Sequence, residues 1–156
     1  MTEINFFTAN AGLADVAKLE VPELKLMYRI EMAGELFYNI LADRVGNETA
    51  ADLLRKNAVE ERGHARRLAR MISIKLGHEW EPTAEEAELL EVPLPESIDS
   101  RMFAAVVQGE LNGDVGYQRW AEAETDDEVV RLLRLNGREE TIHAGRAQQV
   151  FDLLNA

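Results

Sequence analysis

The chain contains no cysteine among its 156 residues. Disulfide bonds, thiolate metal sites and cysteine nucleophiles are therefore excluded. Proline is also scarce: the chain has four, and Pro82, Pro93 and Pro95 lie within one short stretch. The long segments without proline on either side of that stretch favour helices. Hydrophobic residues make up 46% and charged residues 29%, which is typical of a globular protein.

Basic residues are outnumbered, with 17 Lys and Arg against 29 Asp and Glu, and the formal net charge is −12. Such a chain is repelled by phosphate backbones, so we expect no binding to nucleic acid. The N-terminal residues lack both a basic segment and a long apolar run, so we expect no signal peptide, no membrane span and a cytoplasmic location. The length predicts a single domain over residues 1–156.

Four long helices are predicted from apolar residues at helical spacing and from start and stop signals. Pro22 suits the first turn of a helix, whereas Gly46 and Gly77 are stop signals. The expected helices cover residues 22–45, 47 or 49 to 76, 97 or 99 to 124, and 125 or 126 to the C-terminus. A further short helix is expected within residues 8–19, packed outside the others.

The links inside the first and the last pair of helices are only a few residues long, which predicts two antiparallel hairpins. Residues 78–96 form a longer connector, in which Thr83 and Glu86 form a capping box and predict a helix of about two turns. The predicted fold is therefore all-α: two antiparallel helical hairpins joined by a long crossover that contains a short helix. This is the ferritin-like four-helix bundle.

The second half of the chain repeats the first at an offset of 79 residues, with repeats at about 24–76 and 103–155. Each half contains Glu-x-x-His, and residues three apart share a helix face. Each half also has a glutamate in its first helix, about as many residues before the hairpin turn as the Glu-x-x-His motif lies after it. Because helix rise is constant, these glutamates and the motifs should lie at the same height in the bundle. The six residues are Glu31, Glu61, His64, Glu110, Glu140 and His143.

Four buried carboxylates need cations or protons, because unpaired buried charges cost several kcal/mol each. Two divalent ions would neutralise four carboxylates and accept the neutral imidazoles. One glutamate from each of two helices, with Glu-x-x-His from the other two, is the pattern of di-iron and di-manganese proteins. The sequence thus predicts a two-metal centre. The simpler interpretation is an acidic helix face with two surface histidines, but it does not explain why the glutamates and histidines lie at matched heights.

On these residues the chain resembles the ferritin-like superfamily, and its rubrerythrin-type branch in particular, over roughly residues 23–154. The seven-residue step from Glu31 to Tyr38, repeated from Glu110 to Tyr117, adds to the likeness. The resemblance implies that Glu61 and Glu140 bridge the metals. It implies terminal roles for the other ligands, which are Glu31, Glu110, His64 and His143. It also implies two Fe ions per chain, with Mn as the other candidate, and a homodimer.

Two features depart from the rubrerythrin pattern. These 156 residues contain no cysteine-rich electron-transfer domain, and Gly113 stands where a further glutamate is usual. Asp114 and its counterpart Glu35 lie one position further on and are candidates for ligands, with a solvated position equally open. Gly34 and Gly113 could leave room beside the metals.

The remaining repeated residues have both structural and functional interpretations. Tyr38 and Tyr117 are expected to be core residues whose hydroxyls bind a carboxylate, and a catalytic redox role is the alternative. Glu60 and Glu139 could reach the histidine four residues on, but surface exposure is the simpler expectation. Two asparagines could orient ligands or pack in the core, and four arginines are expected to form surface salt bridges. These pairs are Asn57 and Asn136, Arg55 and Arg134, and Arg67 and Arg146. His78 has no repeat partner and is excluded.

The leading hypothesis is a rubrerythrin-like di-iron oxidoreductase that reacts iron with hydrogen peroxide or dioxygen and is reduced again by an external electron donor. The first alternative is a ferritin-like protein for iron storage or detoxification, with ferroxidase activity in an oligomeric shell. The second is a di-metal oxygenase that acts on an organic substrate. It predicts an apolar pocket near Gly34 and Gly113. A purely structural cluster of salt-bridged carboxylates is the fourth interpretation.

Overall fold

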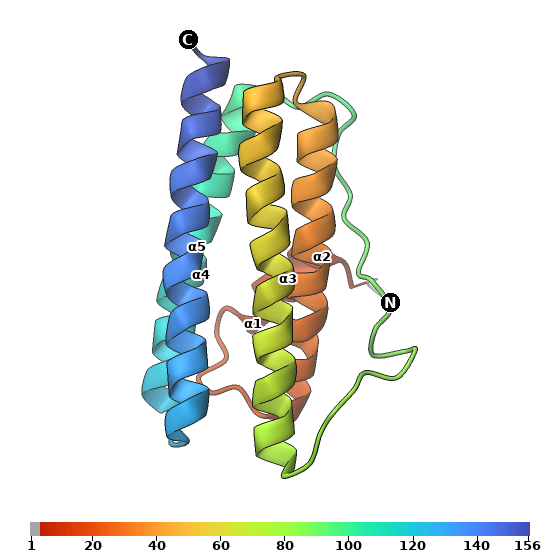
Figure 1. Cartoon of the computed structure of the whole chain (residues 1–156), viewed down its shortest axis with the longest axis vertical. Coiled ribbons are helices and arrows are strands. Elements are labelled where there is room, and N and C mark those ends of the chain that lie inside the picture. The colour runs from red at the N-terminus through yellow and green to blue at the C-terminus, as the bar shows by residue number, and fades with distance from the viewer. Residues whose placement is uncertain (1–3) are drawn as a thin grey trace.

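The computed structural model describes residues 4–156, and within them the chain forms five helices and no strand beyond a single bridge between Asn5 and Glu91. The short first helix precedes the four long helices of the bundle (Figure 1). Their bounds are α1 Phe6–Leu13, α2 Val21–Arg44, α3 Glu48–Leu76, α4 Ser100–Ala123 and α5 Asp127–Leu154. The prediction for the N-terminus rests partly on residues 1–3, which lie outside the described residues. No helix among the described residues has both the length and the apolarity that crossing a bilayer requires.

The helix ends follow the local signals in the sequence. The side chain of Asn47 accepts a hydrogen bond from the backbone of α3, and Asp126 does the same for α5. These caps satisfy N–H groups that have no partner within the helix. Gly77 ends α3 with a φ of 76°, a left-handed conformation that side chains disfavour. The predicted bounds of the four long helices are confirmed to within a few residues.

The crossover determines the topology of the bundle. In Figure 1, α3 and α4 both run from the top of the bundle to the bottom, while α2 and α5 run upward. The connector starts beside the beginning of α2, where Lys25 pairs with Glu86 at 2.8 Å. It finishes beside the end of α2, where Arg44 donates to the carbonyl of Pro95 at 2.9 Å. The predicted ferritin-like arrangement, with two hairpins and a crossover along the bundle, is confirmed.

The short helix predicted in the connector is not formed. Thr83 and Glu86 do make the reciprocal capping-box bonds, at 3.0 and 3.2 Å. Residues 84–87, however, form only a turn, closed by a bond from the Ala87 N–H to the Thr83 carbonyl. The following Glu88 and Leu89 are exposed, so there is no buried apolar face to stabilise a second turn.

Two apolar clusters fill the bundle, one towards each end. The lower cluster includes Leu24, Leu68 and Leu133, and the upper one includes Leu54 and Phe103. All five side chains are at most 1% exposed. Polar side chains occupy the level between the clusters, and this polar layer is the candidate site.

Candidate metal centre

All six residues predicted as ligands meet in the polar layer, and each bundle helix contributes at least one. Their positions are Glu31 on α2, Glu61 and His64 on α3, Glu110 on α4, and Glu140 and His143 on α5. The two histidines are fully buried, and three of the glutamates are between 3% and 7% exposed. Only Glu110 is half-buried. The sequence prediction that these residues lie level with one another is therefore confirmed.

The donor atoms form two groups, one around each histidine. Nδ1 of His143 lies 2.7 Å from Oε1 of Glu61 and 3.7 Å from Oε2 of Glu110. Nδ1 of His64 lies 2.9 Å from Oε1 of Glu140 and 3.3 Å from Oε2 of Glu31. Neighbouring donor atoms on an octahedral ion with bonds of ~2.1 Å lie about 3 Å apart. The distances of 2.7 and 2.9 Å match that spacing, and those of 3.3 and 3.7 Å are somewhat longer.

Several donor atoms in this layer are buried and have no hydrogen-bond partner. They are Oε1 of Glu61, Oε2 of Glu110, Oε1 of Glu140 and Nδ1 of His143. The close approach of His143 to Glu61 is thus not a hydrogen bond, because the geometry between the two atoms does not allow one. Buried polar atoms without partners are rare, since each costs ~1–3 kcal/mol. A cation placed between them would satisfy these atoms, so the residues present fit a metal centre.

A smaller set within the cluster is close enough to hold a single ion. One donor atom from each of Glu61, His64, Glu140 and His143 lies within 4.8 Å of the other three. All four residues are buried. Imidazole and carboxylate donors together suit iron, manganese or zinc. The chain therefore carries a buried Glu/His cluster that could bind metal.

The protonation behaviour of the central glutamates shows how unfavourable their negative charge is without a cation. The pKa of Glu61 is raised well above its usual value by burial and by the charges of Glu31 and Glu110. The pKa of Glu140 is raised in the same direction by burial and by the charges of Glu110 and Glu61. In the metal-free protein these two carboxyls therefore tend to hold protons.

His64 and Glu31 shift towards their charged forms. Burial alone would lower the pKa of His64, but its hydrogen bonds to Glu139 and Glu31 raise that pKa to about 10. Burial also acts to raise the pKa of Glu31, yet the hydrogen bond and the charge of His64 lower it. A protonated imidazole thus serves as a counter-charge in the metal-free protein. A metal that binds at Nδ1 must displace this proton.

Each tyrosine of the repeat donates to a glutamate of the opposite half. Tyr38 on α2 donates to Oε1 of Glu110 at 2.6 Å, and Tyr117 on α4 donates to Oε1 of Glu31 at 2.8 Å. Both tyrosines are 1% exposed. The pKa of each hydroxyl is raised well above 10 by burial and by the neighbouring carboxylates, so both remain protonated donors. The prediction of core tyrosines that bind a carboxylate is confirmed.

Two further glutamates hold the histidines from outside the cluster. Nε2 of His64 donates to Glu139 at 3.0 Å, and Arg67 donates to both oxygens of the same carboxylate at 2.8 and 3.2 Å. Glu60 accepts from Nε2 of His143 at 3.1 Å in the same way. The hydrogen bond to His64 and the neighbouring Arg67 lower the pKa of Glu139 to about 2.

These outer contacts correct two sequence expectations. Glu60 and Glu139 do not bind the histidine four residues on along their own helix, and they are not simply surface residues. Each reaches across to the histidine of the other repeat, because α3 and α5 pack side by side. Such a carboxylate fixes the orientation and the tautomer of a metal-ligating histidine. Glu60 and Glu139 occupy equivalent positions in the two repeats, and this repetition was the signal in the sequence that could have indicated their role.

The paired asparagines and two of the arginines complete this outer layer. Asn57 donates to the backbone carbonyl of His143 at 3.2 Å and accepts from Arg146 at 3.0 Å. Asn136 donates to the carbonyl of His64 at 3.4 Å and accepts from Arg67 at 3.1 Å. Both asparagines are fully buried. They therefore position the segments that carry the histidines, and the two arginines are partly buried rather than on the surface.

Gly34 and Gly113 lie directly against the central carboxylates. A Cβ atom built on Gly34 would overlap Oε2 of Glu61. A Cβ atom on Gly113 would lie 2.8 Å from Oε2 of Glu140, closer than real Cβ contacts. The expectation that these glycines leave room at the centre is confirmed.

The other residues named from the sequence lie away from the cluster or have other partners. Glu35 pairs with Arg62 at 3.3 Å, and Asp114 accepts from Thr141 at 2.6 Å. These two carboxylates therefore bind other side chains and are not among the donor atoms that meet in the polar layer. Arg55 forms an exposed ion pair with Asp43, Arg134 donates to Gln118, and His78 is exposed.

The comparisons with known proteins agree with this geometry. A family model described as Rubrerythrin matches residues 23–151, which is most of the chain and includes every residue of the cluster. Comparisons with curated proteins and with solved structures found no match.

Proposed function

Because the chain belongs to the rubrerythrin family, we propose that it is a di-iron oxidoreductase that reacts bound iron with hydrogen peroxide or dioxygen. In this proposal two iron ions bind among the four glutamates and two histidines of the polar layer, with manganese as the other candidate metal. An external electron donor returns the iron to its reduced state. Homodimer formation stays a prediction from the family resemblance.

The main support for the proposal is the set of buried donor atoms that have no hydrogen-bond partner, in the layer where the two repeats meet. Four carboxylates carry four negative charges, and two Fe(II) ions carry four positive charges. With neutral imidazoles the loaded site would have no net charge, which removes the cost of burying the carboxylates. One lysine or arginine in the layer would not achieve this balance.

The distances support different roles for the inner glutamates. Oε1 of Glu61 lies 2.7 Å from Nδ1 of His143 and 3.7 Å from Nδ1 of His64, so this carboxylate is near both groups of donors. We assign bridging roles to Glu61 and its counterpart Glu140. Glu31 and Glu110 lie at the edges of the cluster and are the terminal carboxylates.

The protein positions these ligands before any metal binds. Tyr38 and Tyr117 each hold one oxygen of a terminal glutamate and leave the other oxygen facing the cluster. Glu60 and Glu139 hold Nε2 of the histidines, so Nδ1 is the nitrogen that faces the carboxylates. When bound, iron supplies Lewis-acid and one-electron redox chemistry. The apolar clusters above and below limit the access of bulk water.

Rapid mixing of the Fe(II)-loaded protein tests this function. The anaerobic protein is mixed with hydrogen peroxide or with dissolved oxygen, and iron oxidation and oxidant consumption are followed together. We expect oxidation faster than that of free Fe(II) in the same buffer, with the preferred oxidant identified by the larger rate.

A pair of variants on one helix supplies the control. Glu110→Ala removes a cluster carboxylate and should slow the reaction by at least tenfold, a typical effect of losing one catalytic group. Glu122→Ala removes an exposed carboxylate from the same helix and should leave the rate unchanged. A wild-type rate equal to that of Glu110→Ala would contradict the proposal.

A further inference from the structure

Helices α2 and α4 are separated along the face of the bundle that α1 covers. In the described part of the chain no Cα atom of α2 lies within 8 Å of one of α4, although both pack closely on their hairpin partners. Between Phe103 and Tyr117 no residue of α4 is buried. On its α2 side this long stretch of α4 therefore has no neighbouring bundle helix packed against it.

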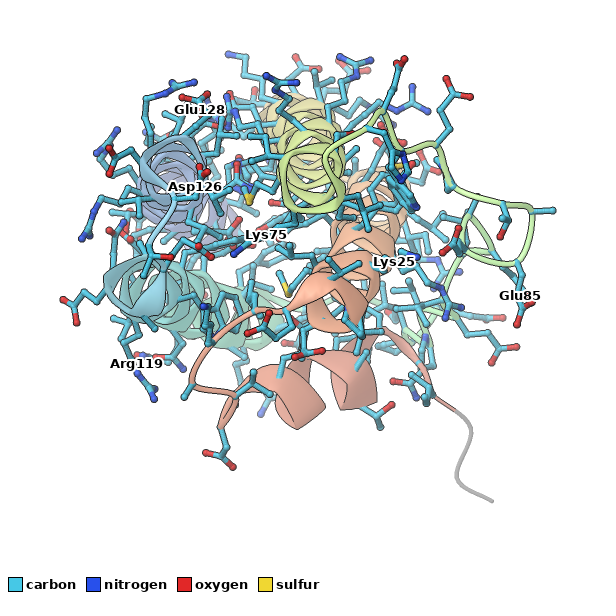
Figure 2. All side chains as sticks on the ribbon, turned by 90° about the horizontal axis from the view of Figure 1, so that it is seen from below. Lys25, Lys75, Glu85, Arg119, Asp126 and Glu128 are labelled. Carbon is cyan, nitrogen blue, oxygen red and sulfur yellow. The ribbon has the colours of Figure 1, made fainter. Side chains whose placement is uncertain are left out.

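Helix α1 lies across this separation, as the end-on view shows (Figure 2). The ring of Phe6 stacks on Phe37 of α2, with 5.2 Å between the centroids. The segment after α1 reaches the other side, where Trp120 of α4 donates to the carbonyl of Val16 at 2.7 Å. The start of α1 is held by a bond from the Phe6 N–H to the Glu91 carbonyl at 2.8 Å.

A cavity of about 440 Å³ lies beneath α1 and reaches the carboxylate cluster. That volume is within the range of pockets that bind small organic molecules. Its walls are mainly apolar and come from α1, α2 and α4, and they include Phe6, Phe7, Ile30, Phe37, Met102 and Val106. Its floor consists of Glu31, Glu61, Glu110 and Glu140, beside Gly113. The exposed residues Ala105 and Gly109 line its outer part.

The cavity combines a large apolar wall with a floor that is neutral when two divalent ions are bound. Hydrogen peroxide is small and polar, so it needs no apolar wall of this size. An anion would gain no net attraction from a neutral centre, and in the metal-free protein it would meet the Glu31 carboxylate, whose pKa is, despite burial, lowered by its bond to His64. An uncharged molecule with an apolar body and a small polar end suits both surfaces.

We propose that this cavity binds a neutral, apolar organic molecule with its polar end at the carboxylate cluster, as the ligand on which the centre acts. The inference rests on the proposed function only for that last role, since the cavity and its walls exist without metal. The cavity lies beside Gly113, where an organic substrate was expected to require an apolar pocket, whereas Gly34 does not line it.

Calorimetric titration with 1-octanol and with octanoate tests the inference on the metal-loaded and on the metal-free full-length protein. We expect saturable binding of octanol at a single site per chain, and octanoate at least about tenfold weaker. Ala105→Phe and Val106→Phe each place a ring in the cavity. Each methylene group kept out of the cavity weakens binding about fourfold, so the displacement of two should weaken octanol binding more than about tenfold.

Ala104→Phe is the matched control, because Ala104 is the exposed neighbour on α4 and does not line the cavity. It should bind octanol like the wild type, and the helical circular dichroism of all three variants should match. Octanol binding that is not saturable, or that Ala105→Phe and Val106→Phe leave unchanged, would overturn the inference, as would octanoate binding as tight as octanol binding. A cavity that only admits dioxygen would give the first of these results.

Metal content measured on the same samples separates this inference from the proposed function. Two metals per chain without octanol binding would overturn the inference and leave the di-iron function standing. Octanol binding by a folded protein that takes up no iron when Fe(II) is added would support the cavity and contradict the di-iron function.

Discussion

Replacing Gly113 by alanine adds a single Cβ atom beside the central carboxylate of Glu140. In an open helical position this change stabilises a protein by ~0.5–1 kcal/mol, because alanine loses less backbone entropy on folding than glycine. At Gly113 the new atom would lie 2.8 Å from Oε2 of Glu140, so the carboxylate has to move. In the metal-free protein the flexible side chain can turn aside. A carboxylate bound to metal cannot do so without loss of a bond.

We therefore expect Gly113→Ala to change metal-free stability by less than ~1 kcal/mol and to weaken metal binding ~10- to 100-fold, the range seen when the support of a ligand is disturbed. Gly109→Ala is the control: it lies one turn earlier on α4, and its Cβ would meet no atom within 4 Å. Its stabilisation of ~0.5–1 kcal/mol should raise the melting temperature by ~1–4 °C, and metal affinity should be unchanged. Metal titrations and thermal melts of both variants give these values. Equal metal affinity in the two variants would show that a Cβ atom at Gly113 does not disturb the carboxylate of Glu140.

Three other changes test separate parts of the structure. Glu140→Gln should raise the melting temperature of the metal-free protein by several degrees at pH 7, because burial and the neighbouring carboxylates make a charge at Glu140 unfavourable and raise its pKa. An unchanged melting temperature would argue against charge repulsion in the layer. Glu139→Gln should weaken metal binding ~10- to 100-fold in a titration without preventing it, because this residue only orients His64. Glu124→Gln should cost ~1–3 kcal/mol in denaturant melts near neutral pH, since it removes the buried negative charge that accepts from Lys75 at 2.7 Å. Burial opposes the shift, but Lys75 lowers the pKa of Glu124 below 4.5, so the wild-type advantage should be full above that pH and disappear as the pH falls through the lowered value.

The helices and their order could be predicted from the sequence because their signals are local. Asn47, Gly77 and Asp126 act within one or two turns of the helix ends that they define, so no tertiary information is needed. The level of the cluster was predictable for a similar reason. Helix rise is constant, so equal distances from a turn bring Glu31 and Glu61 to the same height.

The contacts that sequence reasoning missed all depend on how one helix packs against another. The bond from His64 to Glu139 joins α3 to α5, and periodicity within a single helix does not reveal that register. The connector shows the opposite case. The capping box predicted from Thr83 and Glu86 is formed, but the helix predicted after it is not, because no buried apolar face stabilises a second turn. The cavity beneath α1 follows from the position of a helix whose packing the sequence did not specify.

The iron content of the loaded protein shows whether the polar layer is a two-metal centre. The wild-type protein and Glu61→Ala are loaded anaerobically with Fe(II), freed from excess ion, and assayed for iron per chain. We expect about two ions per wild-type chain and no paired binding in Glu61→Ala, because a bridging carboxylate serves both ions. A folded wild-type protein that retains no iron, or a Glu61→Ala variant that retains the full amount, would contradict this expectation.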